Sequence, residues 1–303
     1  MHLHAAIDTL VVGASALANG KRKYFRASLE SPTIRRMLDG VRLQVPEHQG
    51  DGIVEVPAQT PHGELRCAFR IAQWKGKGYP TIIYHHANGE APLDLTPGSR
   101  SSFRRLFFAR PGPVSANLIA VRAAYHQLPG WERIRRLYDL ANFVAMLSSD
   151  ILLTEEMVRL ARARGSGPVI VAGLSLGGWM TNLHRAYRNT ADVYVPMLAG
   201  AAFDELFLTS VYRFQTARQA RACPETLRKT INFEADFMAA QGAKVFPLLA
   251  RHDQLTQLQR QSRAYGGALI TTLEKGHVTA TLSTEDLRRH VLTQLKRVSV
   301  PEA

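Results

Sequence analysis

The feature that most constrains this chain is the pentapeptide Gly173-Leu174-Ser175-Leu176-Gly177. It stands between an apolar, β-branched run, Pro168 to Ala172, and a helix-competent stretch, Gly178 to Arg188. G-x-S-x-G in this context is typical of a sharp strand-to-helix turn, where the flanking glycines remove Cβ atoms that would clash. The turn exposes the serine hydroxyl and puts the amide of Leu176 at a helix N-terminus, where an oxyanion can be held. The sequence therefore predicts Ser175 as a nucleophile, against the alternative of a plain glycine-rich turn.

Short β-like runs alternate with helical runs, and this order predicts an α/β fold with a mostly parallel central sheet and helices on both faces. With 303 residues and 46% hydrophobic content, the chain is long enough for one large core. Trp131 to Arg164 has no glycine or proline and has apolar residues at helical spacing, so we expect one long helix there. The expected strands, of which the first two can pair antiparallel as an edge, are Gly52–Val56, Leu65–Ile71, Thr81–Tyr84, Asn117–Ala123, Val169–Ala172, Val193–Leu198, Val245–Ala250 and Leu269–Leu273.

The chain divides into a core and two further segments. Residues 1–50 are expected to form an N-terminal helical segment, and residues 51–203 and 241–303 the α/β core. Residues 204–240 exceed the usual length of an α/β connection and are rich in aromatics, so we expect a small helical cap over a pocket. The alternative for this insertion is an ordinary pair of packing helices.

The composition bears on compartment and partners. Cys67 and Cys223 lie far apart and match neither a disulfide framework nor a zinc site, so both are expected to be structural thiols in a reducing compartment. Ala5 to Ala18 contains Asp8, lacks a basic leader and is too short to span a bilayer, so we expect a cytoplasmic protein without a secretion signal. The net charge of +13 attracts phosphates, anionic lipid surfaces or acidic partners.

Two basic segments have alternative interpretations. An N-terminal amphipathic helix with a basic end either packs on the domain or lies on an anionic membrane. Its apolar positions are Ile7, Leu10, Val11 and Leu17, and its basic end is Lys21, Arg22, Lys23 and Arg26. Arginines and phenylalanines interleave from Ser102 to Arg110, a composition that can bind nucleic acid. Because no nucleic-acid-binding motif accompanies it, we expect a half-buried helix with its arginines in water and no nucleic-acid partner.

Two later loops carry the groups that a nucleophilic serine needs. Arg251-His252-Asp253 follows the strand ending at Ala250, and Glu274-Lys275-Gly276-His277 follows the strand ending at Leu273. The carboxyl ends of parallel strands meet at one edge of a sheet, the edge that also carries Ser175. We therefore predict His277 as the general base and Asp253 as its orienting acid. His252 is the rival base, and Asp204 is the alternative acid.

The strand Thr81–Tyr84 runs into a turn, His85-His86-Ala87-Asn88-Gly89. A second oxyanion donor is expected in the loop after this strand, so we assign the role to the amide of Ala87, with the Asn88 side chain as a helper. Adjacent histidines rarely share one ion, and no acidic cluster accompanies them. We expect no metal.

In these motifs the chain resembles the α/β-hydrolases, from about Val54 to Leu295. The motifs are GLSLGG at the elbow, HHANG, RHDQLT with the acid and KGHV with the histidine. The resemblance implies the α/β-hydrolase fold, a Ser175 nucleophile, a His277 base, an Asp253 orienter and no cofactor. Two departures leave the substrate class open: His86-Ala87-Asn88 replaces a glycine run, and Ala124-Tyr125-His126 replaces Asp-x-Arg-Gly.

The predicted function is that of a serine hydrolase that cleaves a carboxylic ester through an acyl-enzyme. The positive charge and the aromatic insertion favour a lipid ester or thioester with peripheral contact to an anionic membrane, while a small soluble ester, a peptide or an acyltransferase acceptor stays open. The alternative is a non-catalytic module with the same fold that binds an anionic membrane surface or a protein partner.

Overall fold

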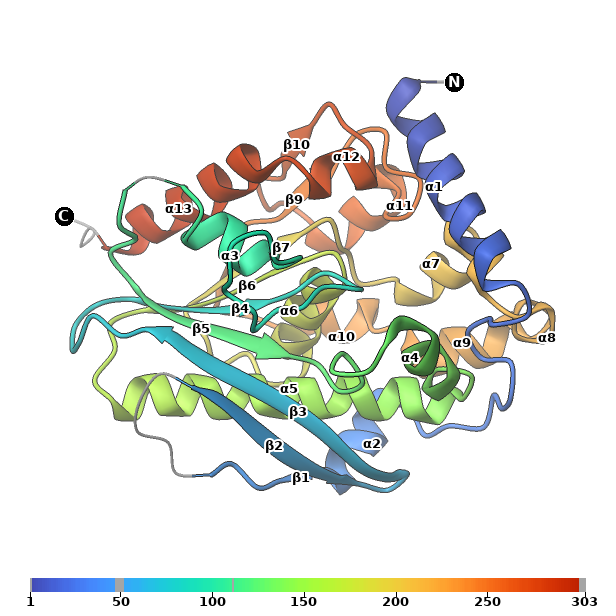
Figure 1. Ribbon diagram of the computed structural model, residues 1–303, viewed down its shortest axis with the longest axis horizontal. Helices are drawn as coiled ribbons and strands as arrows, with labels where there is room; N and C mark the ends of the chain where they lie inside the picture. Colours follow the sequence, from blue (N-terminus) through green and yellow to red (C-terminus); the bar gives the residue numbers. More distant parts are fainter. Residues whose placement is uncertain (1, 47–51, 111, 300–303) are drawn as a thin grey trace.

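A computed structural model describes residues 2–46, 52–110 and 112–299 of the chain. Within these residues, ten strands form one sheet in the order β1-β2-β3-β5-β4-β6-β7-β9-β10, with β8 paired to β7 (Figure 1). The strands are β1 Arg42–Leu43, β2 Ile53–Thr60, β3 Gly63–Gln73, β4 Thr81–His85, β5 Asn117–Arg122, β6 Val169–Leu174, β7 Val193–Met197, β8 Lys244–Val245, β9 Leu248–Ala250 and β10 Thr271–Leu273.

The sheet is mostly parallel, as the sequence predicted. Strands β5, β4, β6, β7, β9 and β10 run parallel, and β1, β2 and β3 form an antiparallel edge that joins β5. The expected antiparallel pairing of the first two strands, β2 and β3, is confirmed, whereas the short β1 was not predicted. In the register of β4 and β6, His85 lies opposite Gly173, so the HHANG loop and the serine turn leave the sheet side by side.

Helices cover both faces of the sheet, which is also confirmed (Figure 1). One buried cluster joins α2, α5 and α6 to one face, and the other joins α3 and α13 to the opposite face. The helices are α1 Leu3–Asn19, α2 Ile34–Gly40, α3 Ser102–Phe107, α4 Gly130–Arg136, α5 Leu140–Ala163, α6 Leu176–Tyr187, α7 Phe203–Leu208, α8 Arg218–Ala222, α9 Pro224–Ile231, α10 Glu234–Ala239, α11 Leu258–Gln261, α12 His277–Thr281 and α13 Thr284–Ser299, with 3₁₀ turns η1 Val211–Gln215 and η2 Ser262–Tyr265.

The expected single helix from Trp131 to Arg164 is wrong, because the segment divides into α4 and α5. The break is made by a neighbouring strand-like segment rather than by glycine or proline. The carbonyls of Leu137 and Tyr138 accept the amides of Phe25 and Ala27, at 3.1 and 2.8 Å. Backbone groups that would continue the helix are thereby used in a tertiary contact. The break turns α4 toward the carboxyl edge of the sheet.

Two predicted strands are shorter than expected. Val245–Ala250 separates into β8 and β9 around Pro247, which has no N–H to donate to a ladder. Leu269 is 76% exposed and precedes β10, which begins only at Thr271. Both strands still end where the sequence placed their ends, at Ala250 and Leu273, so the loops that follow them are unaffected.

The segment between β7 and β8 contains α7, η1 and α8 to α10. Five of its side chains line a cavity at the carboxyl edge of the sheet: Phe203, Leu206, Phe207, Tyr212 and Gln215. A cap formed by residues 204–240 stays a prediction, as do the other domain limits. The expected boundary between residues 50 and 51 lies outside the described residues.

Helix α1 packs on the domain, but through a different face from the expected apolar one. Its buried residues are Ala5, Asp8, Val12 and Ala16, while Leu10 and Leu17 are 71% and 84% exposed. The helix lies against η1 and α12, beside the carboxyl edge of the sheet (Figure 1). None of the described helices combines the length and apolarity needed to cross a membrane.

The basic segment from Ser102 to Arg110 forms α3 and the turn after it. Phe103 and Phe107 are buried, as expected for a half-buried helix. The arginines do not simply face water: Arg105 pairs with Glu90 at 3.5 Å and Arg110 with Glu285 at 3.2 Å. This segment therefore does not form an unpaired cationic face.

Candidate active site

Ser175 sits at a strained turn between β6 and α6. Its backbone is in the left-handed region, with φ 54° and ψ −112°, which is costly for a residue with a Cβ. The neighbouring glycines explain how the chain fits: a Cβ at Gly177 would lie 2.2 Å from the His85 carbonyl oxygen, and one at Gly173 would lie 2.1 Å from the Gly177 carbonyl oxygen. This is the geometry of a nucleophile elbow.

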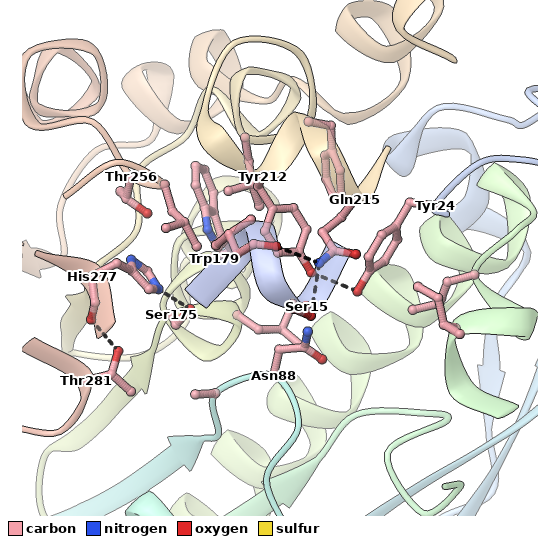
Figure 2. Close-up of a pocket in the computed structure, with 18 of the residues that line it drawn as sticks. Ser15, Tyr24, Asn88, Ser175, Trp179, Tyr212, Gln215, Thr256, His277 and Thr281 are labelled. Carbon is pink, nitrogen blue, oxygen red and sulfur yellow. Dashed lines mark hydrogen bonds between the residues drawn. The ribbon is translucent and has the colours of Figure 1, made fainter. Parts of the chain in front are cut away.

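The structure brings Ser175, His277 and Asp253 together at the carboxyl edge of the sheet. His277 Nε2 lies 2.8 Å from Ser175 Oγ (Figure 2). On the other side of the ring, His277 Nδ1 lies 2.7 Å from Asp253 Oδ2. The other carboxylate oxygen of Asp253 accepts the amides of Leu255 and Thr256, both at 2.7 Å. With Nδ1–H donating to the carboxylate, Nε2 is free to accept the serine proton.

The surroundings of His277 favour its protonated form. Burial lowers the pKa of the imidazole, but the carboxylates of Asp253 and Asp8 outweigh burial, so the pKa is raised overall. An imidazolium formed by proton transfer from the serine is thus stabilised. The neutral, proton-accepting form is correspondingly lost at a higher pH than in an isolated imidazole.

Neither His252, the rival base, nor Asp204, the alternative acid, occupies the place of His277 or Asp253 beside Ser175. The His252 ring stacks on His2 at a centroid distance of 3.6 Å, and its Nε2 lies 3.5 Å from Glu274. Asp204 is buried in α7, where its Oδ1 accepts the Asn232 amide at 2.7 Å. Burial raises the pKa of Asp204. His277 contacts Asp253 instead, so the geometry favours the predicted pair.

The two predicted oxyanion donors flank Ser175 and line the same cavity. Leu176 is the first residue of α6, so its N–H has no partner within the helix. Ala87 is buried in the HHANG loop, and its amide lies near the carboxylate of Glu90. Burial raises the pKa of Glu90, although Ser102, Arg105 and the Ala87 amide act in the opposite direction. The amide of Ala87 is therefore shared between the cavity and an acidic neighbour, and its predicted role stays a prediction.

The adjacent histidines of this loop are used structurally. His85 contacts Asp150 at 3.1 Å through Nδ1 and Thr154 at 3.0 Å through Nε2. His86 donates from Nδ1 to the Ala87 carbonyl at 2.8 Å and accepts the Ala123 amide at Nε2, at 3.2 Å. Burial lowers the pKa of His86 to about 4, so it is neutral near pH 7. The two rings hold the loop in place.

Sequence reasoning missed Asp8, a fully buried carboxylate on α1. Its Oδ2 accepts the amides of His277 at 2.7 Å and Gln254 at 3.1 Å, and its Oδ1 accepts the amide of Val278 at 2.9 Å. One N-terminal side chain thus holds both loops that carry the acid and the base. The available signal was a lone Asp among apolar residues, but nothing in the sequence pointed to its partners.

A cavity of about 500 Å³ opens beside Ser175. Apolar side chains form much of its wall: Val12, Phe143, Met146, Trp179, Phe203, Leu206 and Phe207. At the end away from His277, Tyr212 donates to Tyr24 at 3.1 Å and Gln215 donates to Ser15 at 3.0 Å (Figure 2). The cavity therefore offers an apolar wall and a polar end to a molecule that reaches Ser175.

Comparisons with known proteins agree with this fold. A family model described as "Alpha/beta hydrolase domain containing 18" matches residues 117–244, which include Ser175. No curated protein matches the chain. The structure is similar to acetyl xylan esterase 1 from Thermoanaerobacterium sp. JW/SL YS485, with a TM-score of 0.52 and 14% identity over 89% of this chain and 97% of that one.

Two further solved structures are similar. An acetyl xylan esterase from Paenibacillus sp. R4 has a TM-score of 0.53 and 12% identity, covering 94% of each chain. An acylaminoacyl peptidase has a TM-score of 0.51 and 14% identity, covering 82% of this chain and 40% of its own. At such identities the likeness establishes the fold. The sheet order and the elbow at Ser175 are those of the α/β-hydrolase fold.

Proposed function

We propose that this protein is a serine hydrolase that cleaves a carboxylic ester through an acyl-enzyme. The observation that carries the proposal is the continuous relay from Ser175 through His277 to Asp253, with contacts of 2.8 and 2.7 Å. A relay of this kind, attached to a serine in a strained elbow, matches the needs of general-base activation. The solved esterases and the peptidase show that this fold is compatible with acyl transfer.

In the proposed reaction, Ser175 Oγ attacks the ester carbonyl while His277 Nε2 takes the serine proton. The tetrahedral oxyanion accepts hydrogen bonds from the amide of Leu176 and from the HHANG loop. Because Glu90 competes for the amide of Ala87, we propose that the next amide, that of Asn88, shares this role. His277 then returns the proton to the leaving alcohol, and a water molecule activated by the same histidine releases the acid.

The apolar wall of the cavity supports a lipid ester or thioester as the substrate, since an acyl chain buries apolar surface there. Helix α1 supports a membrane location for this reaction. Leu3, Leu10 and Leu17 are 70%, 71% and 84% exposed on α1, which also contributes Val11 and Val12 to the cavity. A helix with an exposed apolar stripe followed by basic residues fits an anionic lipid surface.

A burst experiment tests this proposal. Wild-type protein mixed with an excess of an activated aryl ester is expected to release a stoichiometric burst of phenol before the steady state, because acylation by such an ester is faster than deacylation and the acyl-enzyme accumulates. Ser175→Ala is expected to abolish both the burst and the turnover. Ser15→Ala serves as a control, since Ser15 lines the same cavity but bonds Gln215 rather than a histidine. Full turnover by a folded Ser175→Ala protein contradicts the proposal, and absence of turnover in the wild-type protein favours a non-catalytic module.

A further inference from the structure

The charge of the cavity is unbalanced. Among the described residues that line it, Arg133 is the only lysine or arginine, and none is an aspartate or glutamate. His126 also lines the cavity, but burial lowers its pKa well below the usual value, with His86 and Arg133 acting in the same direction. A fixed positive charge therefore faces a cavity in which the described side chains offer no carboxylate to balance it.

Arg133 lies close to the proposed reaction centre. It projects from α4 against the HHANG loop, where a Cβ at Gly89 would lie 3.8 Å from its Nη2 atom. Gly89 follows Ala87 by two residues, and two residues of extended chain span at most about 7 Å. The guanidinium is therefore about one short acyl or alcohol chain away from the proposed oxyanion site.

Within the described part of the chain, the guanidinium of Arg133 forms neither a salt bridge nor a hydrogen bond with another residue. It differs in this from many other arginines of the protein, such as Arg105 and Arg260, which pair with glutamates. Guanidinium groups are suited to two-pronged binding of carboxylate and phosphate oxygens. Beside it, the Asn88 side chain contributes further polar groups to the cavity.

We infer that Arg133 binds an anionic group of the substrate, a carboxylate or a phosphate that lies a few bonds from the scissile ester. The inference rests on the proposed function for the identity of the reacting bond, and it adds the class of molecule that the cavity selects. The charge of the whole chain, +13, attracts such a substrate before it reaches the cavity.

Pairs of one anionic and one neutral ligand test this inference. The carboxylate arm compares an aryl monoester of adipic acid with the aryl ester of 6-methylheptanoic acid, in which two methyl groups replace the carboxylate oxygens. The phosphate arm compares a 1-acylglycerol 3-phosphate with the 1-acylglycerol of the same chain. Binding is measured by calorimetry in the Ser175→Ala background, so that the result does not depend on turnover, and kcat/KM is measured in the wild type.

In Arg133→Gln we expect the preference for the anionic member of a pair to fall about 10- to 100-fold, the effect of losing one charged hydrogen-bonding partner. Arg133→Lys is expected to restore part of it, because the charge remains but the two-pronged geometry is lost. Arg135→Gln is the matched control, an exposed arginine on α4 that does not line the cavity. A change in only one arm identifies that group as the one bound.

Two outcomes overturn the inference: equal binding of the anionic and neutral members to the Ser175→Ala protein, or a preference that Arg133→Gln leaves unchanged. These outcomes differ from failure of the proposed function. If Ser175→Ala hydrolyses the esters at the wild-type rate, the proposed function fails, while the binding comparison still decides the role of Arg133.

Discussion

Replacement of Asp8 by Asn tests how helix α1 supports the site. The carboxylate accepts three backbone amides from the two loops that carry Asp253 and His277. An asparagine that keeps its oxygen in the Oδ2 position retains two of these hydrogen bonds. It then turns its NH₂ group toward the amide of Val278, so one buried N–H loses its acceptor.

A hydrogen bond to a charged group contributes about 1.5–3 kcal/mol, so we expect Asp8→Asn to lower the free energy of unfolding by about 2–3 kcal/mol. Asp8→Ala removes all three acceptors and is expected to cost about 3–5 kcal/mol, less than a simple sum because the three bonds share one carboxylate. Urea unfolding measures both values. Asp39→Asn is the control, an exposed carboxylate on α2.

Asp8→Asn is also expected to change the pH profile of kcat/KM. Asp8 is one of the two carboxylates that raise the pKa of His277 against the opposing effect of burial. Removing its charge lowers that pKa, so the acidic limb of the kcat/KM profile should move to lower pH. The plateau should also fall about 10- to 100-fold, because the histidine loop loses a contact that fixes its position. If Asp8→Asn has wild-type stability and its acidic limb does not move, Asp8 does not support the loops that carry Asp253 and His277.

Three further predictions concern the acid, the elbow and the membrane surface. Asp253→Asn should lower kcat about 10³- to 10⁴-fold through loss of the correct histidine tautomer, whereas Asp204→Asn should not; a reversed ranking at equal stability would assign the acid to Asp204. Gly177→Ala should destabilise the fold by about 2–3 kcal/mol in urea unfolding, because the added Cβ meets the His85 carbonyl. Gly13→Ala, whose Cβ meets nothing within 4 Å, should not destabilise it, and equal stabilities of the two variants would contradict the close approach at Gly177. Binding to acidic vesicles should weaken with salt and with Leu10→Ser and Leu17→Ser together, as measured by sedimentation, and binding that ignores both changes would remove α1 from the membrane proposal.

The parallel strands and the loops after them were predictable from local sequence. The apolar runs ending at Ala172, Ala250 and Leu273 each fix a strand end, and residues directly after parallel strands gather at one edge of the sheet. Ser175, Asp253 and His277 could therefore be proposed as neighbours without knowledge of the helices between them. The elbow glycines added a local steric reason, which the contact between Gly177 and His85 bears out.

The remaining features depend on tertiary contacts that leave no local pattern. The break between α4 and α5 arises because residues near Phe25, more than a hundred positions earlier, take the carbonyls of Leu137 and Tyr138. That break places Arg133 at the cavity, whereas a continuous helix gave no reason to single it out. The packing face of α1 was mistaken for a similar reason: the His4 carbonyl and the Asp8 carboxylate fit closely against Gly276, while Leu10 and Leu17 face outward.

Labelling by a fluorophosphonate followed by peptide mapping tests directly whether Ser175 is the nucleophile. One adduct is expected, on the Ser175 hydroxyl, that is lost in Ser175→Ala and retained in Ser15→Ala. An adduct on another residue, or equal labelling of a folded Ser175→Ala protein, would contradict this role of Ser175.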